Sequence, residues 1–559
     1  MPLNVLLVAS EAVPLAKTGG LGDMVSAYAA ALREAGVDAT ILLPAYPNAI
    51  AATVGLSKVG NLQSDRPARR RDAALLRGRM PDTGVPVLLL RCDALYARTG
   101  LYQDAQGRDY PDNAVRFAKL SAAVRIAQGV HGVKKPDIVH AHDWHTGLTP
   151  LLMKHAGVQA KSVFTIHNLA FQGNYALSVG PSLGVPDKWL AHAFSNPESI
   201  EFYGALSLMK AGIVHSDRVT TVSETYAHEI LTPRFGHLME GVLQSCQDKL
   251  SGVVNGIDDT TWNPAVDATI ARNYSFDDMR GKHACKRALQ RMFGLPADPF
   301  APLMAIGSRM TGQKLADVVL DALPRLLEKH PRLQLAVIGK GEAYIEKGFR
   351  KLAQEWPDRV GVHIGYDERR AHALHAGADI LLHASRFEPC GLTQLYAMRY
   401  GTLPVASRVG GLADTIVDAA QNADRLTETM TRNVLRPAAY LRDGTYDQPI
   451  AQAPTHRASR AATGFLFDGE RAQDVIDAAS RAIDAYMRPP TWRALQRNAM
   501  SCDFGWNEAV AKMVALYVDV SHVRPSRTAL RARRVVESAA PARDDQALAG
   551  GKTQAVKSA

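Results

Sequence analysis

Short apolar runs rich in β-branched residues alternate with longer helical patterns along most of this 559-residue chain. The runs of the first half are "LNVLLVAS", "ATILLPAY", "VPVLLLRC", "DIVHAHD", "KSVFTIHN", "DRVTTVS" and "SGVVNGID". Those of the second half are "PLMAIGSRM", "LQLAVIGKG", "RVGVHIGY", "ADILLHAS" and "TLPVASRVGG". Uninterrupted apolar strands separated by helices are typical of parallel sheets covered on both faces. The pattern predicts an α/β protein with two Rossmann-like, doubly wound domains and a boundary near residues 256–300.

The same pattern divides the chain into predicted parts. We expect an N-terminal domain over 1–258 and a C-terminal domain over 259–505, because one core does not serve a chain of this length. A polar stretch over about 419–462 is interpreted as a surface insertion in the second domain. A last helix, 506–520, is expected to pack back toward the first domain. Residues 521–559, rich in Ala, Arg and Ser, are expected to form a disordered basic tail.

Charge and composition limit the classes of partner. Half of the formal net charge of +10 comes from residues 521–559, so the body is nearly balanced and no nucleic-acid partner is expected. The apolar fraction of 47% is typical of a globular protein, and no apolar run approaches the ~20 residues of a membrane span. No signal peptide is expected, since the N-terminus lacks a basic leading region. The 5 cysteines are scattered without CxxC spacing, which favours a cytoplasmic location and no disulfide framework.

Polar residues come at the ends of many of the predicted strands. They are Lys17, Asp143, His167, Asn255, Arg309, Tyr366 and Glu388. In open parallel sheets, ligands bind outside the carboxyl ends of the strands. If the two sheets face each other across a cleft, these side chains converge in it.

The stretch "KTGGLGD", residues 17–23, lies where the first strand should become a helix. Glycines let the backbone approach a ligand, and a helix start offers N–H groups to an anion. The spacing matches neither the dinucleotide-binding fingerprint nor the P-loop. A phosphate site and a tight turn beside a solvated lysine are both open interpretations of this stretch.

The second half of the chain contains further candidate side chains. Arg309 and Lys314 could grip a diphosphate or be ordinary surface cations. Glu388 could accept hydrogen bonds from sugar hydroxyls or cap the helix that follows it. Three histidines, 140, 142 and 145, lie close together in the first half, but no fourth ligand with suitable spacing is visible, and no metal site is predicted.

Several motifs occur in a fixed order: "KTGGLGD", "HAHDWHTGL", "TIHNLAFQG", "VNGID", "SRMTGQK", "SRFEPCGLTQLYAMRYGTLPVASRVGGLADT", "TGFLF" and "DFGW". Together they resemble bacterial glycogen synthase and plant starch synthase over residues 3–518. The resemblance implies a glycosyltransferase B-type fold, with the acceptor on the N-terminal domain and the nucleotide sugar on the C-terminal domain. It implies retaining transfer of glucose from ADP-glucose to the non-reducing 4-hydroxyl of an α-1,4-glucan such as glycogen, without a cofactor or metal.

The resemblance also implies roles for the residues at matching positions. Lys17, Gly19 and Gly20 would lie at the phosphates and glucose of the donor, and Arg309 and Lys314 would neutralise the diphosphate. Glu388 would hold the donor sugar, His167 would orient it, and Tyr366 would stack on the nucleobase. The remaining contacts would come from Asp143, Asn255, Cys390, Gly391, Leu392, Thr393, Tyr96 and Tyr102.

The chemistry of the implied reaction agrees with these roles. Bond cleavage builds positive charge on the anomeric carbon and negative charge on the diphosphate, which nearby cations stabilise. We expect no protein nucleophile; the acceptor hydroxyl would attack on the same face, with the leaving phosphate as base. Domain closure would exclude water from the donor.

Two features depart from the family pattern. The chain has Leu315-Ala316 where the family usually has glycine, and the insertion after Asp418 is longer than the family's connection. Spacing does not specify the nucleobase, so a related transferase using UDP-glucose or a small acceptor is an alternative. A catalytically silent glucan-binding protein is an alternative from another class. The oligomeric state is not predicted, and no membrane partner is expected.

Overall fold

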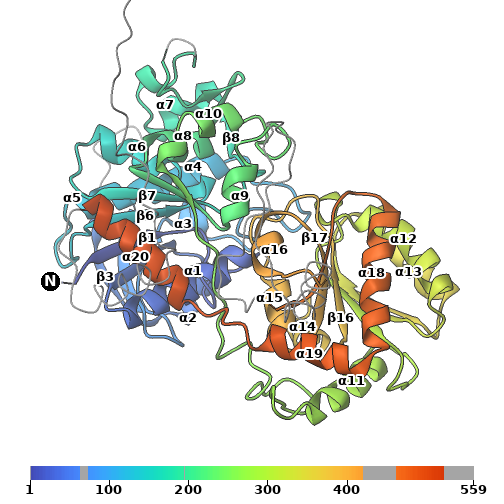
Figure 1. Cartoon of the computed structure of the whole chain (residues 1–559). Helices are drawn as coiled ribbons and strands as arrows, with labels where there is room; N and C mark the ends of the chain where they lie inside the picture. The colour runs from blue at the N-terminus through green and yellow to red at the C-terminus, as the bar shows by residue number, and fades with distance from the viewer. Residues whose placement is uncertain (1, 63–72, 194–195, 420–460, 522–559) are drawn as a thin grey trace, which may run out of the picture.

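The computed structural model describes residues 2–62, 73–193, 196–419 and 461–521. Two large sheets, each flanked by helices, form two domains that lie side by side (Figure 1). The predictions for the insertion and for the basic tail concern residues that lie almost entirely outside the described ranges.

The N-terminal domain contains a 9-stranded sheet in the order β12-β11-β7-β6-β1-β2-β5-β4-β3. Its strands are β1 (Asn4–Val8), β2 (Asp38–Pro44), β3 (Val54–Leu62), β4 (Ala73–Arg79), β5 (Pro86–Arg91), β6 (Ile138–His142), β7 (Lys161–Ile166), β11 (Arg218–Thr221) and β12 (Leu250–Gly252). All neighbours pair in parallel except β4, which is antiparallel to β3 and β5. The apolar runs did not predict β3 and β4. β3 is an edge strand whose side chains are mostly exposed, and β4 carries the exposed Arg77 and Arg79 in its second half.

The C-terminal domain contains a 6-stranded parallel sheet in the order β15-β14-β13-β16-β17-β18. Its strands are β13 (Leu303–Gly307), β14 (Gln334–Gly339), β15 (Val360–Ile364), β16 (Ile380–His383), β17 (Leu403–Ser407) and β18 (Phe465–Phe467). A separate 3-stranded antiparallel sheet, β8 (Asn174–Ala176), β10 (Ala205–Ser207) and β9 (Glu201–Phe202), belongs to the N-terminal domain.

Helices cover both large sheets. Those of the N-terminal domain are α1 (Gly20–Glu34), α2 (Pro47–Ala52), α3 (Asp93–Tyr96), α4 (Asn113–Ala118), α5 (Ala123–Gln128), α6 (Leu148–His155), α7 (Gly180–Leu183), α8 (Leu208–His215), α9 (Glu224–Glu229) and α10 (Glu240–Gln244). Those of the C-terminal domain are α11 (Arg280–Met292), α12 (Ala316–Lys329), α13 (Ala343–Glu355), α14 (Glu368–Gly377), α15 (Thr393–Arg399), α16 (Gly410–Thr415), α18 (Ala472–Tyr486) and α19 (Pro489–Met500). Within the described ranges, no helix has both the length and the apolar character that a membrane span requires.

The strand order reverses once in each sheet, between β1 and β6 and between β13 and β16. Ligands of doubly wound sheets bind at such reversals, outside the carboxyl ends of the strands. The loops that follow these four strands carry Lys17, Asp143, Arg309 and Glu388. The topology therefore places four of the predicted site residues at the two positions where this fold class binds ligands.

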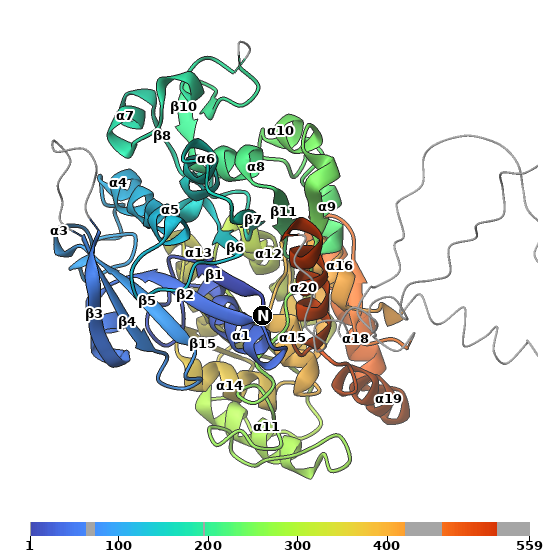
Figure 2. The same ribbon diagram turned by 90° about the vertical axis from the view of Figure 1, so that its left-hand side faces the viewer.

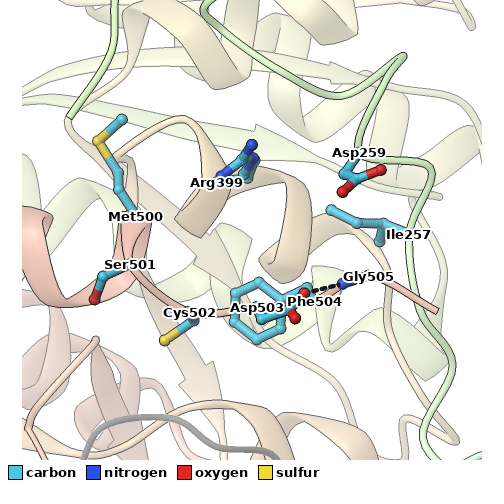
Figure 3. A pocket seen from close by; sticks show the side chains of 9 residues that line it. All are labelled: Ile257, Asp259, Arg399, Met500, Ser501, Cys502, Asp503, Phe504 and Gly505. Carbon is cyan, nitrogen blue, oxygen red and sulfur yellow. Dashed lines mark hydrogen bonds between the residues drawn. The ribbon is translucent and has the colours of Figure 1, made fainter. Parts of the chain in front are cut away.

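The chain crosses between the domains twice. The first crossover follows β12, and the second leads from α19 to α20 (Asn507–Ser521), which lies beside α1 on the N-terminal domain (Figures 1 and 2). The Ile257 N–H donates to the Phe504 carbonyl at 2.8 Å, so the two crossovers are bonded to each other. A cavity of about 190 Å³ lies beside them, lined by Ile257, Asp259, Arg399 and residues 500–505 (Figure 3). None of the predicted site residues lines this cavity.

Candidate active site

A buried carboxylate holds the loop between β1 and α1. Glu11 accepts hydrogen bonds from the Thr18 N–H at 2.6 Å, the Thr18 hydroxyl at 2.7 Å and the Gly19 N–H at 3.2 Å. The Tyr102 hydroxyl donates to the same carboxylate at 2.5 Å. A Cβ on Gly19 would meet no protein atom within 4 Å, so the fold itself does not require glycine at this position. The loop thus has room for a ligand to approach its backbone.

Lys17 lies in this loop with its side chain 32% exposed, and its ammonium donates to Asp23 at 2.8 Å. Burial alone would lower the pKa of Lys17, but the Asp23 carboxylate holds it above its ordinary value. Tyr366 of the C-terminal domain lies close enough to Lys17 for the Lys17 charge to oppose the rise that burial causes in the pKa of Tyr366, and the residue is 73% exposed. The loop after β1 is therefore close to an open aromatic ring of the opposite domain.

Glu388 follows β16 and is only 7% exposed. Its Oε2 forms an ion pair with Lys314, accepts the Ser385 hydroxyl at 2.9 Å and lies 3.1 Å from His383 Nε2. Burial alone would raise the pKa of Glu388, but the Lys314 charge and the His383 hydrogen bond hold it well below its ordinary value. The carboxylate is therefore ionised at neutral pH. All three of these contacts fall on Oε2, so Oε1 remains as an acceptor for hydroxyl groups.

Arg309 and Lys314 lie on the same loop, between β13 and α12, but their surroundings differ. Arg309 is exposed, and its guanidinium donates to Gln313 at 2.7 Å. Lys314 is mostly buried against Glu388, with its side chain 11% exposed. The loop thus supplies one cation that is exposed to solvent and one that is held beside the carboxylate.

Leu315, where the sequence departs from the family pattern, has a well-defined backbone conformation. Leu315 takes a left-handed backbone with φ 48° and is fully buried. The loop before it is tied to Arg386, which donates to the Gly312 carbonyl and pairs with Asp317 at 2.8 Å. Lys314 still reaches the carboxylate after β16, so the leucine does not displace this predicted residue.

Asp143 follows β6 with φ 60° and ψ 177°, a conformation rare for a non-glycine residue and worth roughly 1–3 kcal/mol of strain. Its carboxyl accepts the N–H groups of His167 at 2.9 Å and Asn168 at 3.4 Å. Burial raises the pKa of Asp143 to about 7. His167 lies 3.1 Å from His142 through their ring nitrogens, and burial lowers the pKa of His167 to about 3. The His167 ring is therefore neutral at physiological pH.

The loop after Glu388 contacts the N-terminal domain. Gly391 has φ 71°, and a Cβ there would clash with Gln394, so glycine is required. Burial raises the pKa of the Cys390 thiol to about 12, although hydrogen bonds with Asn255 oppose this. A Cβ on Gly20 would lie 3.5 Å from the Leu392 side chain. Thr393 begins α15.

The structure thus brings the glycine loop, Tyr366, Asn255 and residues 390–393 together where the two domains meet. Comparison with known proteins gives two family matches, the starch synthase catalytic domain over residues 4–245 and glycosyl transferases group 1 over residues 295–429. The glycogen synthase of Ralstonia nicotianae is 49% identical, over 93% of this chain and 89% of that protein. This chain belongs to the glycogen synthase family. The glycogen synthase of Paramagnetospirillum magneticum is 42% identical, over 92% of this chain and 97% of that protein.

A solved structure supports the assignment to the glycogen synthase family. The catalytic domain of starch synthase IV from Arabidopsis thaliana, bound to ADP and acarbose, matches with a TM-score of 0.77 and 28% identity, over 94% of this chain and all of that one. The predicted family, glycosyltransferase B-type fold and hexosyltransferase activity are confirmed. Membership of the glycogen synthase family implies a nucleotide-sugar donor and a glucan acceptor.

The sugar contact predicted for Tyr96 does not agree with the structure. Tyr96 is fully buried, its hydroxyl donates to the Arg116 carbonyl at 2.7 Å, and its ring packs against Tyr46. It is a core residue because α3 turns it inward. Tyr102 is partly buried, and its bond to Glu11 makes it a support of the glycine loop.

Four residues that contact the predicted site were missed from the sequence: Glu11, Asp23, His383 and Ser385. Glu11 and Ser385 come soon after apolar strands, the same signal that identified Asp143. Their contacts to Thr18 and Glu388 depend on how the loops fold, which spacing does not reveal. Among the described residues, no group of three or more His, Cys, Asp or Glu side chains is arranged to hold a metal ion.

Proposed function

We propose that this enzyme transfers glucose from ADP-glucose to the non-reducing 4-hydroxyl of an α-1,4-glucan, with retention of configuration and without a metal. The observation that carries the proposal is the arrangement around Glu388. A buried, ionised carboxylate with one uncommitted oxygen lies beside Lys314, on the loop that also carries Arg309.

The two cations are suited to a diphosphate leaving group. Arg309 offers an exposed guanidinium fork to a phosphate. Lys314 has three ammonium donors, so it can keep its contact with Glu388 and still bind a phosphate oxygen. Lys17 and the open backbone at Gly19 would contact the same donor from the N-terminal domain. Removing one such charge typically costs about 10²–10³ in rate.

Glu388 and His167 would orient the donor glucose. The Oε1 atom of Glu388 accepts hydroxyl groups, while its other oxygen is held by three partners. His167 is neutral, which suits a hydrogen-bonding role more than proton delivery. The acceptor hydroxyl then attacks on the face from which the phosphate leaves, and the phosphate takes its proton.

The choice of ADP-glucose over UDP-glucose has separate support. Tyr366 offers an exposed ring on which either nucleobase could stack. The starch synthase IV catalytic domain was solved with ADP, and it is 28% identical to this chain. We therefore assign adenine as the base of the donor.

The test measures incorporation of labelled glucose into glycogen from ADP-glucose and from UDP-glucose, with a chelator present. Wild type, Glu388→Ala and the control Glu355→Ala, a carboxylate on the exposed face of α13, are compared. We expect incorporation from ADP-glucose that the control retains and Glu388→Ala loses by about 10²-fold or more.

Other outcomes would each correct one part of the proposal. Preference for UDP-glucose would overturn the choice of donor and leave the site intact. Loss of activity with the chelator, restored by a metal, would overturn the metal-free mechanism. No incorporation from either donor, with retained glycogen binding, would indicate a silent glucan-binding protein.

A further inference from the structure

Two short helices from opposite domains cap each other. Helix α9 of the N-terminal domain and α16 of the C-terminal domain lie side by side in both views (Figures 1 and 2). Asp414 of α16 accepts the Ser223 hydroxyl at 2.7 Å and the Thr225 N–H at 3.1 Å at the start of α9. Glu229, the last residue of α9, accepts the Gly410 N–H at 3.0 Å at the start of α16. Each helix thus supplies a carboxylate to the N-terminus of the other.

These contacts differ in burial from an ion pair that also joins the two domains. Asp414 is 6% exposed and Ser223 is fully buried. The Arg234–Glu470 pair, in contrast, has side chains that are 64% and 40% exposed. Exposed pairs contribute little, whereas a buried carboxylate left without its donors is costly. The mutual caps are therefore the stronger of these two polar links between the domains.

The start of α16 also contacts the backbone of the active-site loop. The Gly411 N–H donates to the Glu388 carbonyl at 3.0 Å. A Cβ on Gly410 would clash with the Glu388 carbonyl, and one on Gly411 would clash with the Cys390 carbonyl. The backbone of Glu388 and the first turn of α16 are therefore packed too closely to move independently.

We propose that Asp414 and Glu229 are positioning residues that couple the approach of the two domains to the placement of Glu388. The inference rests on the function proposed above, in which Glu388 holds the donor sugar. When α9 docks on α16, the caps hold Gly410 and Gly411 in place, and these set the position of the Glu388 backbone. When the domains separate, the caps break, and Glu388 loses this support. The arrangement restricts the productive geometry to the closed enzyme, which excludes water from the donor.

The test compares Asp414→Ala, Asp414→Asn, Glu229→Ala and the double variant Asp414→Ala/Glu229→Ala. The control is Glu224→Ala, which removes a carboxylate of α9 whose partner Lys512 lies in α20 and not in α16. Steady-state kinetics with ADP-glucose and glycogen separate kcat from KM, and small-angle X-ray scattering measures the radius of gyration with and without ADP.

We expect Asp414→Ala to lower kcat by about 10–100-fold, with a much smaller change in KM for the donor, because misplacement of a reacting group has this cost. Its radius of gyration with ADP should exceed that of wild type. Asp414→Asn keeps an acceptor for the Thr225 N–H and should recover part of kcat. The double variant should have a kcat only slightly below that of either single variant, since both carboxylates support the same contact between α9 and α16.

A folded Asp414→Ala with the kcat and radius of gyration of wild type would overturn the proposal. A rise in KM with unchanged kcat would do the same, since it would indicate a role in binding only. If Asp414→Ala does not fold, kcat and the radius of gyration of Asp414→Asn and Glu229→Ala test the proposal instead. If wild type is inactive with ADP-glucose, the proposed function fails, while the scattering comparison still tests the link between the domains.

Discussion

Two leucines hold a left-handed backbone, with φ 48° at Leu315 and φ 68° at Leu238. This conformation costs a non-glycine residue about 1–2 kcal/mol. Leu315 is fully buried, whereas Leu238 is 63% exposed. Burial of a leucine contributes about 1.5–3 kcal/mol, and its removal leaves a cavity with a further cost. Burial therefore outweighs strain at Leu315 but not at Leu238.

We predict different effects of the two glycine substitutions on the free energy of unfolding. Leu315→Gly should lower the free energy of unfolding by about 1–3 kcal/mol, because lost burial exceeds relieved strain. Leu238→Gly should leave it unchanged or raise it by about 1 kcal/mol. Urea unfolding followed by circular dichroism measures both. A Leu315→Gly variant as stable as wild type would mean that strain is the larger effect at this position.

The raised pKa of Asp143 predicts that the stability of the folded chain depends on pH. Its pKa is about 7 in the folded chain, against about 3.9 for an exposed aspartate. As the pH rises from about 4 to 7, the unfolded chain loses the proton first, so the folded state loses up to about 4 kcal/mol of relative stability. The N–H groups of His167 and Asn168 face this carboxyl, and the charge of Glu11 adds to the effect of burial.

Asp143→Asn removes this titration and keeps the acceptor oxygen. The variant should therefore become more stable relative to wild type as the pH rises from about 4 to about 7. Urea midpoints at several pH values give the difference directly. A constant difference across this range would mean that Asp143 ionises normally in the folded chain.

At the scale of elements, α20 belongs to the N-terminal domain although it follows the C-terminal one in sequence. Tyr517 of α20 is fully buried, lies 2.8 Å from the Tyr28 hydroxyl and lies 2.6 Å from His140 Nδ1. The rings of His140 and His142 pack with centroids 4.1 Å apart, and His142 contacts His167. The last helix is thus part of the packing beneath the candidate active site.

We predict that Tyr517→Phe lowers the free energy of unfolding by about 1–3 kcal/mol, because it leaves the Tyr28 hydroxyl and the Nδ1 atom of His140 without a buried partner. The exposed Tyr203, at 77%, provides the control substitution Tyr203→Phe, which should have no measurable effect. Equal stability of both variants would show that water or a rearranged hydroxyl replaces the lost bond.

At the scale of the whole molecule, the two crossovers determine how the domains approach. Gly256 packs directly on the second crossover, and a Cβ there would lie 2.9 Å from Gly505 and Trp506. Such a distance is too short for a real side chain, so one crossover must shift. Because both domains are attached here, the shift changes their relative placement.

We predict that Gly256→Ala lowers kcat by about ten-fold or more, since small misplacements across an active site have large effects. The control is Gly241→Ala in α10, where a Cβ meets no atom within 4 Å. Kinetics with ADP-glucose and glycogen provide the comparison. Unchanged kcat in Gly256→Ala would mean that the crossovers adjust without moving the domains.

Much of the fold could be predicted because each buried parallel strand appears in the sequence as a short apolar run. The central strands β1, β6, β13 and β16 are almost entirely buried and mostly apolar, so their runs are visible in the sequence. The edge strand β3 exposes most of its side chains, and β18 is only 3 residues long, so neither produces such a run.

By itself, the sequence determined the fold class, the family and the order of the candidate site residues, because these follow from apolar runs and motifs that are local in the chain. Only the tertiary structure decided which of those side chains meet. Tyr96 turned into the core, Lys314 reached Glu388 across 74 residues, and Asp414 reached α9 across 189. Local sequence patterns do not reveal contacts between residues so far apart in the chain. These contacts depend on the relative placement of the two domains, which comes from packing between distant segments.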